Sequence, residues 1–96
     1  MKVYTEPEIY QLIDTDLVWW EYTDDGVLVA TYEFKDFLES VSFVNDVAEI
    51  AEELSHHPDI DIRYNVVSLW LCTHDEDGQI TELDVTLAKA IEDLVL

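Results

Sequence analysis

The sequence predicts an α+β domain in which three helices cover one face of a four-stranded antiparallel sheet. Apolar residues recur at helical spacing in three segments and at strand spacing in four, and these segments follow the order α-β-β-α-β-β-α. Strands joined as hairpins leave one sheet face free, so the apolar sides of the helices are expected to pack together on the other. Ninety-six residues without a linker or repeat form a single domain, residues 1–96.

The first third of the chain predicts a short helix followed by a hairpin. Thr5 is a suitable N-cap for a helix over 5–13, which has acidic residues in its first turn. The segments 17–22 and 27–34 are rich in β-branched and aromatic residues, which favours strands. Between them, residues 24–26 read Asp-Asp-Gly, a sequence typical of hairpin turns.

Residues 35–54 predict a long helix with two apolar stripes. Steps of three and four place one set of residues on a common stripe: Phe34, Phe37, Val41, Val44, Ala48 and Ala51. A second stripe lies beside it: Phe43, Val47, Ile50 and Leu54. One stripe is enough to cover a sheet. Two stripes therefore suggest that part of this helix also packs against another subunit.

The second half of the chain predicts two strands and a final helix. Residues 55–59 end the long helix, and the segments 60–64 and 66–73 read as strands. Residues 74–79 form an acidic loop. The last helix, 81–95, begins with Thr-x-x-Asp, which is a capping-box pattern with Asp in place of the usual Glu.

The composition argues against several classes of function. There are 23 acidic and 4 basic residues, a formal net charge of −19, which opposes binding to nucleic acids or anionic membranes. One cysteine allows neither a disulfide framework nor a cysteine-based zinc site. No apolar stretch suits a membrane span or a secretory signal, so we expect a cytoplasmic protein. The acidity itself fits a solvated surface, a salt-rich host or a basic protein partner.

All three histidines lie at the ends of predicted elements. His56 and His57 follow the long helix and precede Pro58, while His74 follows a strand. Glu52 lies one helical turn before His56. Functional side chains often gather at element ends, and imidazole exchanges protons near neutral pH. Each feature also has a plain structural interpretation, because loops are polar and exposed carboxylates are common in this chain.

Other interpretations of these residues remain open from spacing alone. A zinc site made by the histidines and Glu52 is conceivable, but adjacent histidines rarely bind one ion and no HExxH motif is present, so we expect no metal. Helix capping alone explains Asp84. The three tryptophans suit a core or an interface.

The residues taken together form a more specific pattern. It reads E-x3-H-H-P-x5-Y-x9-H-x9-D and comprises Glu52, His56, His57, Pro58, Tyr64, His74 and Asp84. With FKDF at 34–37 and HHPD at 56–59, the pattern resembles the pterin-4a-carbinolamine dehydratase family. Members of this family are also known as dimerisation cofactors of a homeodomain transcription factor. The resemblance covers roughly two-thirds of the chain.

The resemblance implies an enzyme that converts 4a-hydroxytetrahydropterin to quinonoid dihydropterin and water during tetrahydrobiopterin recycling. It implies that the enzyme uses no metal and no cofactor. The pterin is the substrate. His56 and His74 would be the acid/base pair, and His57 would act with them and bind the pterin. The family also implies a homodimer or homotetramer. An intact histidine set favours the enzyme over a non-catalytic interaction or assembly module on the same scaffold.

The resemblance also assigns supporting roles. Pro58 and Thr73 would shape the pterin pocket, and Glu52 and Asp84 would orient imidazoles. The family carries an upstream tryptophan, and an ungapped count from FKDF favours Trp19 over Trp20 for it. Because the net negative charge favours imidazolium, we expect the activity optimum to move to lower pH as added salt screens that charge.

Overall fold

The computed structural model describes residues 1–95 and contains the predicted α-β-β-α-β-β-α order, with one short 3-10 turn (η1) added before the last helix. The expected α+β class is confirmed. The elements are α1 (Glu6–Thr15), β1 (Trp20–Tyr22), β2 (Leu28–Glu33), α2 (Phe37–Leu54), β3 (Asp59–Arg63), β4 (Val66–Leu71), η1 (His74–Glu76) and α3 (Glu82–Val95).

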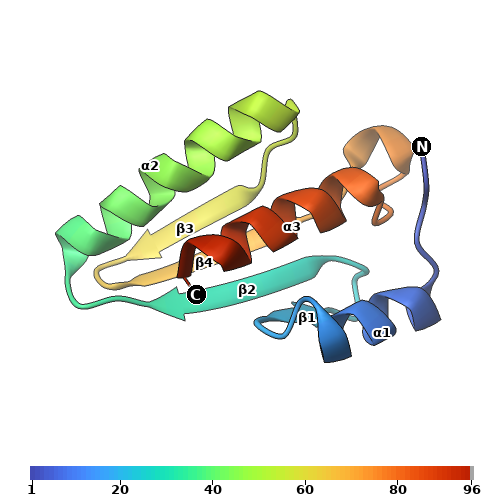
Figure 1. Ribbon diagram of the computed structural model, residues 1–96, viewed down its shortest axis with the longest axis horizontal. Helices are drawn as coiled ribbons and strands as arrows, with labels where there is room; N and C mark the ends of the chain where they lie inside the picture. The colour runs from blue at the N-terminus through green and yellow to red at the C-terminus, as the bar shows by residue number, and fades with distance from the viewer. Residues whose placement is uncertain (96) are drawn as a thin grey trace.

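The four strands form one antiparallel sheet in the order β1-β2-β4-β3. Figure 1 shows α2 and α3 lying side by side across one face of this sheet. Helix α1 closes the same face at the β1 end, where the ring of Tyr10 meets that of Tyr22 edge-on. Among residues 1–95, no helix is long and apolar enough to cross a membrane.

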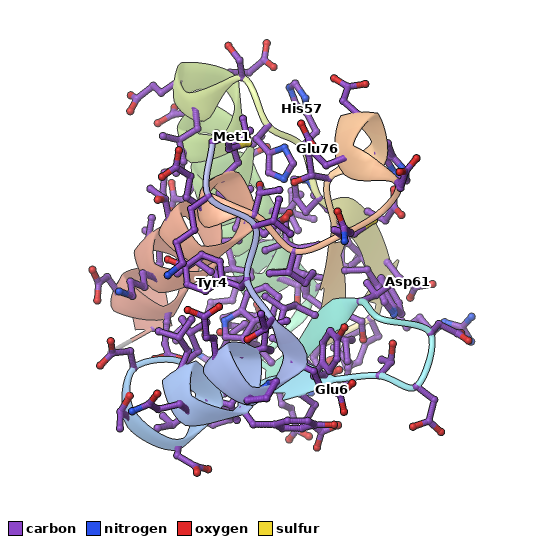
Figure 2. The ribbon with its side chains drawn as sticks, turned by 90° about the vertical axis from the view of Figure 1, so that its right-hand side faces the viewer. Met1, Tyr4, Glu6, His57, Asp61 and Glu76 are labelled. Atoms are coloured by element: carbon purple, nitrogen blue, oxygen red, sulfur yellow. The ribbon has the colours of Figure 1, made fainter. Side chains whose placement is uncertain are left out.

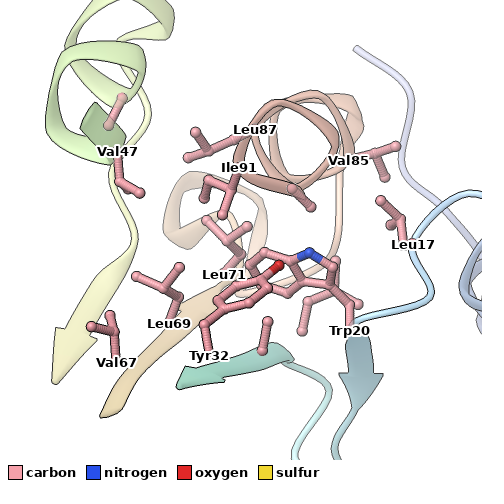
Figure 3. Close-up of a cluster of buried hydrophobic side chains, with 14 of the residues drawn as sticks. Leu17, Trp20, Tyr32, Val47, Val67, Leu69, Leu71, Val85, Leu87 and Ile91 are labelled. Atoms are coloured by element: carbon pink, nitrogen blue, oxygen red, sulfur yellow. The ribbon is translucent and has the colours of Figure 1, made fainter. Parts of the chain in front are cut away.

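Strand alternation separates a buried face of the sheet from an open one. Every second residue of β2 and β4 is buried under the helices (Figure 3): Leu28, Ala30, Tyr32, Val67, Leu69 and Leu71. The residues between them point the other way and remain partly or fully exposed, among them Val29, Thr31, Ser68 and Trp70. The open face therefore carries both apolar and polar side chains at the surface.

Helix α2 buries the stripe from Phe43 to Leu54 and part of the stripe from Phe34 to Ala51. Phe43 and Val47 are buried against the sheet, and Ile50 and Leu54 pack partly against them. In the stripe from Phe34 to Ala51, Ala51 is buried and Phe34 and Val44 pack partly against the core, whereas Phe37 is 50% exposed. Packing of the exposed part of α2 against another subunit stays a prediction.

The first strand is shorter than the sequence predicted. The segment Leu17–Trp19 forms a turn, and only Trp20–Tyr22 pairs with β2. The Leu17 N–H donates to the carbonyl oxygen of Leu12, which closes the end of α1. The Leu17 side chain is fully buried. Its apolar character therefore serves to anchor a helix end in the core rather than to extend a strand.

Two turns follow from local sequence. Gly26 has a φ of 82°, a conformation that glycine adopts without strain, and it closes the β1–β2 hairpin. Arg63 pairs with Val66, so Tyr64 and Asn65 alone connect β3 to β4. The two predicted strands are thus joined by a tight hairpin.

Candidate active site

The end of α2 sets the positions of the adjacent histidines. Ser55 adopts a left-handed conformation with φ 52°, which terminates the helix. Its N–H still bonds to the carbonyl oxygen of Glu52, and the N–H of His56 bonds to that of Ala51. The chain therefore turns sharply between the helix and β3. His56 becomes buried, whereas His57 stays at the surface.

His56 is held by a buried carboxylate. Its Nε2 lies 2.5 Å from Oδ1 of Asp84, which is fully buried in the first turn of α3. The other carboxylate oxygen, Oδ2, accepts hydrogen bonds from the Thr73 hydroxyl at 2.6 Å and the Thr81 N–H at 2.9 Å. An ionised carboxylate only accepts, so Nε2 of His56 carries a proton and Nδ1 is the acceptor of the neutral ring.

The hydrogen bonds around Asp84 form a chain in which each donor points toward the Asp84 carboxylate. The Thr73 hydroxyl donates to Asp84, so the Thr81 hydroxyl donates to Thr73 Oγ1, at 2.7 Å. The Leu83 N–H donates in turn to Thr81 Oγ1. The expected capping role of Asp84 is thus present, through the Thr81 N–H, but the same carboxylate also orients His56. A buried charge needs such a set of donors to offset the loss of water.

His57 pairs with Glu52 across the last turn of α2. The Glu52 carboxylate lies within hydrogen-bonding contact of His57 Nε2. Both side chains are well exposed, His57 at 62% and Glu52 at 75% of their surface, so solvent screens this pair. Figure 2 shows His57 on the side of α2 that faces the 3-10 turn. The pair therefore restricts the ring without burying it.

His74 begins the 3-10 turn that follows β4. The backbone of Thr73 accepts from the Gly78 N–H and donates to the Gln79 carbonyl, which folds residues 74–79 into a tight loop. Gly78 has a φ of 75°, so a glycine suits this position. The loop places the exposed His74 ring opposite the segment that carries His56 and His57, as the cavities below show.

Two adjoining cavities connect the three imidazoles. The first, of about 210 Å³, is lined by Val27, His57, Asp59, Trp70, Cys72 and His74. The second, of about 260 Å³, is lined by Ser55, His56, His57, Cys72, Thr73, His74, Asp75 and Leu83. They share His57, Cys72 and His74. The result is one hollow, here called the histidine hollow, with space for a small ring system.

The arrangement is suited to moving protons. Three imidazoles border the histidine hollow, and one of them is fixed by a buried carboxylate. Imidazole can give or take a proton near neutral pH. In residues 1–95, no group of three or more His, Cys, Asp or Glu side chains is arranged to hold a metal ion.

Comparison with known proteins identifies the family. The family model described as pterin 4 alpha carbinolamine dehydratase matches residues 2–94. The chain belongs to the pterin 4 alpha carbinolamine dehydratase family. Two curated relatives are named, provisionally, pterin-4-alpha-carbinolamine dehydratases. The relative from Thermomicrobium roseum is 57% identical over 78% of each chain, and that from Sulfurisphaera tokodaii is 44% identical over 99% of each.

Solved structures share the fold. A crystal structure from Brucella melitensis, titled a transcriptional coactivator/pterin dehydratase, matches with a TM-score of 0.88 at 33% identity, over 96% of this chain and 97% of that one. A pterin dehydratase-like protein described as a RuBisCO assembly factor matches with a TM-score of 0.66 over 78% of this chain and 87% of that one. At 19% identity, the second likeness shows the fold alone.

The structure brings most of the expected family residues together. The three histidines and Thr73 line the histidine hollow, with Glu52 and Asp84 bonded to imidazoles behind them. Pro58 is half-buried between His57 and β3 and does not line either cavity.

Trp19 lies elsewhere. It is 51% exposed and lines a separate hollow with Val18, Glu21, Val29 and Thr31. Trp20 is the buried member of the pair, at 1% exposure. The structure therefore does not bring Trp19 to the histidines, and a role for it in binding a pterin gains no support from this placement.

Sequence reasoning missed the apolar floor of the histidine hollow. Trp70 lies on the open face of β4 and Cys72 directly follows that strand, four and two residues before His74. The sequence had suggested only a core or interface role for Trp70 and a place inside an apolar strand for Cys72. The signal was available, because strand alternation continued through the predicted strand 66–73 to the next residue places 70, 72 and 74 on one side. Burial raises the pKa of the Cys72 thiol, and the negative charges of Asp84 and Asp59 raise it further. The thiol is thus a weak nucleophile.

Proposed function

We propose that this protein catalyses the dehydration of 4a-hydroxytetrahydropterins to quinonoid dihydropterins by histidine acid/base catalysis. The observation that carries the proposal is the His56–Asp84 pair at the edge of a hollow that His57 and His74 also line. Family membership supports it, since the relatives' names describe this activity.

The reaction needs two proton transfers on neighbouring atoms. The C4a hydroxyl leaves as water once an imidazolium has protonated it. A neutral imidazole takes the proton from N5, and the electrons of the N–H bond form the new C4a–N5 double bond as the C–O bond breaks. Each positioned transfer accelerates a reaction by about 10²–10⁴-fold. His56 and His74 serve as this acid/base pair.

The remaining residues bind and orient. His57 contacts the pterin, and Glu52 limits the motion of its ring. Asp84 keeps the His56 proton on Nε2, and Thr73 holds Asp84 in place. Pro58 stiffens the segment after His57. No metal or cofactor takes part in this scheme, because one imidazole gives a proton to the C4a hydroxyl and another takes the proton from N5.

The test compares dehydration rates of freshly generated 4a-hydroxytetrahydropterin with and without protein. The His56→Ala variant should lose most of the acceleration while remaining folded by circular dichroism. Glu53→Ala, a change of an exposed residue on the last turn of α2, is the matched control and should keep it. Equal rates for the His56→Ala and wild-type proteins would contradict the proposed role of His56.

We also propose that the protein works in the cytoplasm as a homodimer or homotetramer. Two exposed apolar features support assembly. The first is the first turn of α2, where Phe37 and Leu38 are exposed, and the second is the edge strand β3 with Ile60 and Ile62, each more than a third exposed. An open strand edge can pair with a strand of another chain, and an exposed apolar patch can pack against another surface. Sedimentation at micromolar concentration showing only an 11 kDa species would contradict this assembly.

A second candidate function is binding to a protein partner. The Brucella structure carries a coactivator title beside the dehydratase one, and a net charge of −19 suits a basic partner. Such binding does not need the histidines. A partner captured equally by the wild-type and His56→Ala proteins would therefore assign the two functions to different surfaces.

A further inference from the structure

The first cavity is lined by four residues besides His57 and His74. They are Val27, Asp59, Trp70 and Cys72. Asp59 and Trp70 are directly opposite each other in the β3–β4 register, so their side chains project side by side from the open face of the sheet. The chain continues from Trp70, near the end of β4, through Cys72 to His74, and all three line the cavity. Trp70 and Asp59 are therefore available beside the imidazoles to contact a ligand in this cavity.

The Asp59 carboxylate borders this cavity, and none of the ion pairs among residues 1–95 neutralises it. Arg63, the cation of β3, pairs with Asp61 instead. Asp59 also acts on Cys72 in the same cavity, because its negative charge helps to raise the pKa of the Cys72 thiol. A carboxylate in this position is a strong acceptor for a ligand that presents paired N–H groups.

The chemistry of a pterin matches these two side chains. Its bicyclic ring is flat, which suits packing against an indole face. Its aminopyrimidinone edge presents N3–H and the 2-amino group side by side, the same fork of donors that a guanidinium offers to a carboxylate. We propose that Trp70 packs against the ring and that Asp59 accepts both N–H groups, so that this pair selects pterins over bicyclic rings that lack the 2-amino group. This inference rests on the proposed function and adds the residues that set its specificity.

The test measures binding separately from catalysis. The probe is 7,8-dihydropterin, which has the aminopyrimidinone edge and no 4a-hydroxyl to lose, and its Kd is measured by calorimetry. Asp59→Asn should raise this Kd and the KM for dehydration by about 10- to 100-fold, because a charged pair of hydrogen bonds is lost. Trp70→Leu should raise both by about 3- to 10-fold. In both variants kcat should change less than the binding constants.

A matched variant and a matched ligand sharpen the result. Asp61→Asn removes the next carboxylate on the same face of β3, outside the cavity, and should bind like the wild type. The ligand 7,8-dihydrolumazine has an oxygen in place of the 2-amino group. It should bind the wild type weakly and bind Asp59→Asn more tightly than the wild type, because an amide can donate to that oxygen.

The outcomes separate this inference from the proposed function. Wild-type Kd and KM in both Asp59→Asn and Trp70→Leu would overturn the recognition role and leave dehydration standing. The recognition role is equally overturned if Asp59→Asn lowers only kcat, or if its affinity for dihydrolumazine does not rise. A wild-type protein that neither binds dihydropterin nor accelerates dehydration would overturn the proposed function itself.

Discussion

The Asp84→Asn substitution probes how one buried carboxylate connects helix capping to proton transfer. Asp84 accepts hydrogen bonds from His56 Nε2, the Thr73 hydroxyl and the Thr81 N–H. An amide has one acceptor oxygen, and that oxygen must face Thr73 and Thr81 because both are donors. The new NH₂ group then faces His56 Nε2, which can only accept from it. The ring proton moves to Nδ1. This nitrogen, which in the wild type is the free acceptor that can take a proton from substrate, then already carries one.

The expected magnitudes follow from those contacts. Dehydration should slow by about 10²–10⁴-fold, the contribution of one positioned proton transfer. The free energy of unfolding should fall by about 1–3 kcal/mol, since hydrogen bonds to a charged group are replaced by neutral ones. The assay pairs the dehydration rate with urea unfolding and with ¹⁵N NMR of the histidine rings, which reports the tautomer directly.

A control on the same helix removes the effect of net charge. Asp93→Asn neutralises an exposed carboxylate of α3 and should leave rate, stability and tautomer unchanged. If Asp84→Asn retained the wild-type rate, or kept the proton on Nε2 of His56, the proposed positioning role would be refuted. A rate loss that appears only where the variant is unfolded would refute it equally.

Three further predictions concern charge. Added salt should move the pH optimum of dehydration to lower pH, because it screens the net charge of −19 that favours imidazolium, and a pH–rate profile indifferent to salt would contradict this. Iodoacetamide should alkylate Cys72 more slowly in the folded protein than in urea at pH 8, because its raised pKa leaves less thiolate, and equal rates would show that the thiol is not shielded. Hydrogen bonds from the Thr5 backbone and from Lys2 lower the pKa of Glu8 to about 2. The stabilisation of α1 by Glu8 should therefore be complete above pH 4.5 and be lost as the pH falls toward 2. A Glu8→Gln variant with the same acid unfolding profile as the wild type would contradict this.

The sequence predicted the fold well where local signals agree with tertiary structure. Thr5 and Glu8 form a capping box at the predicted start of α1, and the alternation along β2 and β4 marks the face that the helices cover. The predicted strand over 17–22 was too long, because Leu17 is apolar for a different reason: it anchors the end of α1. Strand propensity cannot distinguish these two uses of an apolar side chain.

Tertiary contacts limited the prediction of the site. The spacing of His56, His57 and His74 indicated a shared site, and the structure places all three around one hollow. Periodicity gave Asp84 a capping role, but its second bond, to His56, depends on how α3 lies against α2. The choice between Trp19 and Trp20 depended on an ungapped count through a hairpin. Hairpin lengths vary, so such a count does not fix which of the two corresponds to the tryptophan of the family.

The most direct test of the central claim is dehydration of 4a-hydroxytetrahydropterin by the wild-type and His74→Ala proteins, each shown to be folded, at low and at molar salt. Both salt concentrations are needed because so acidic a chain can require screening to remain folded. We predict that wild type accelerates the loss of water and that His74→Ala does not. No acceleration by folded wild-type protein at either salt concentration would contradict the dehydratase function.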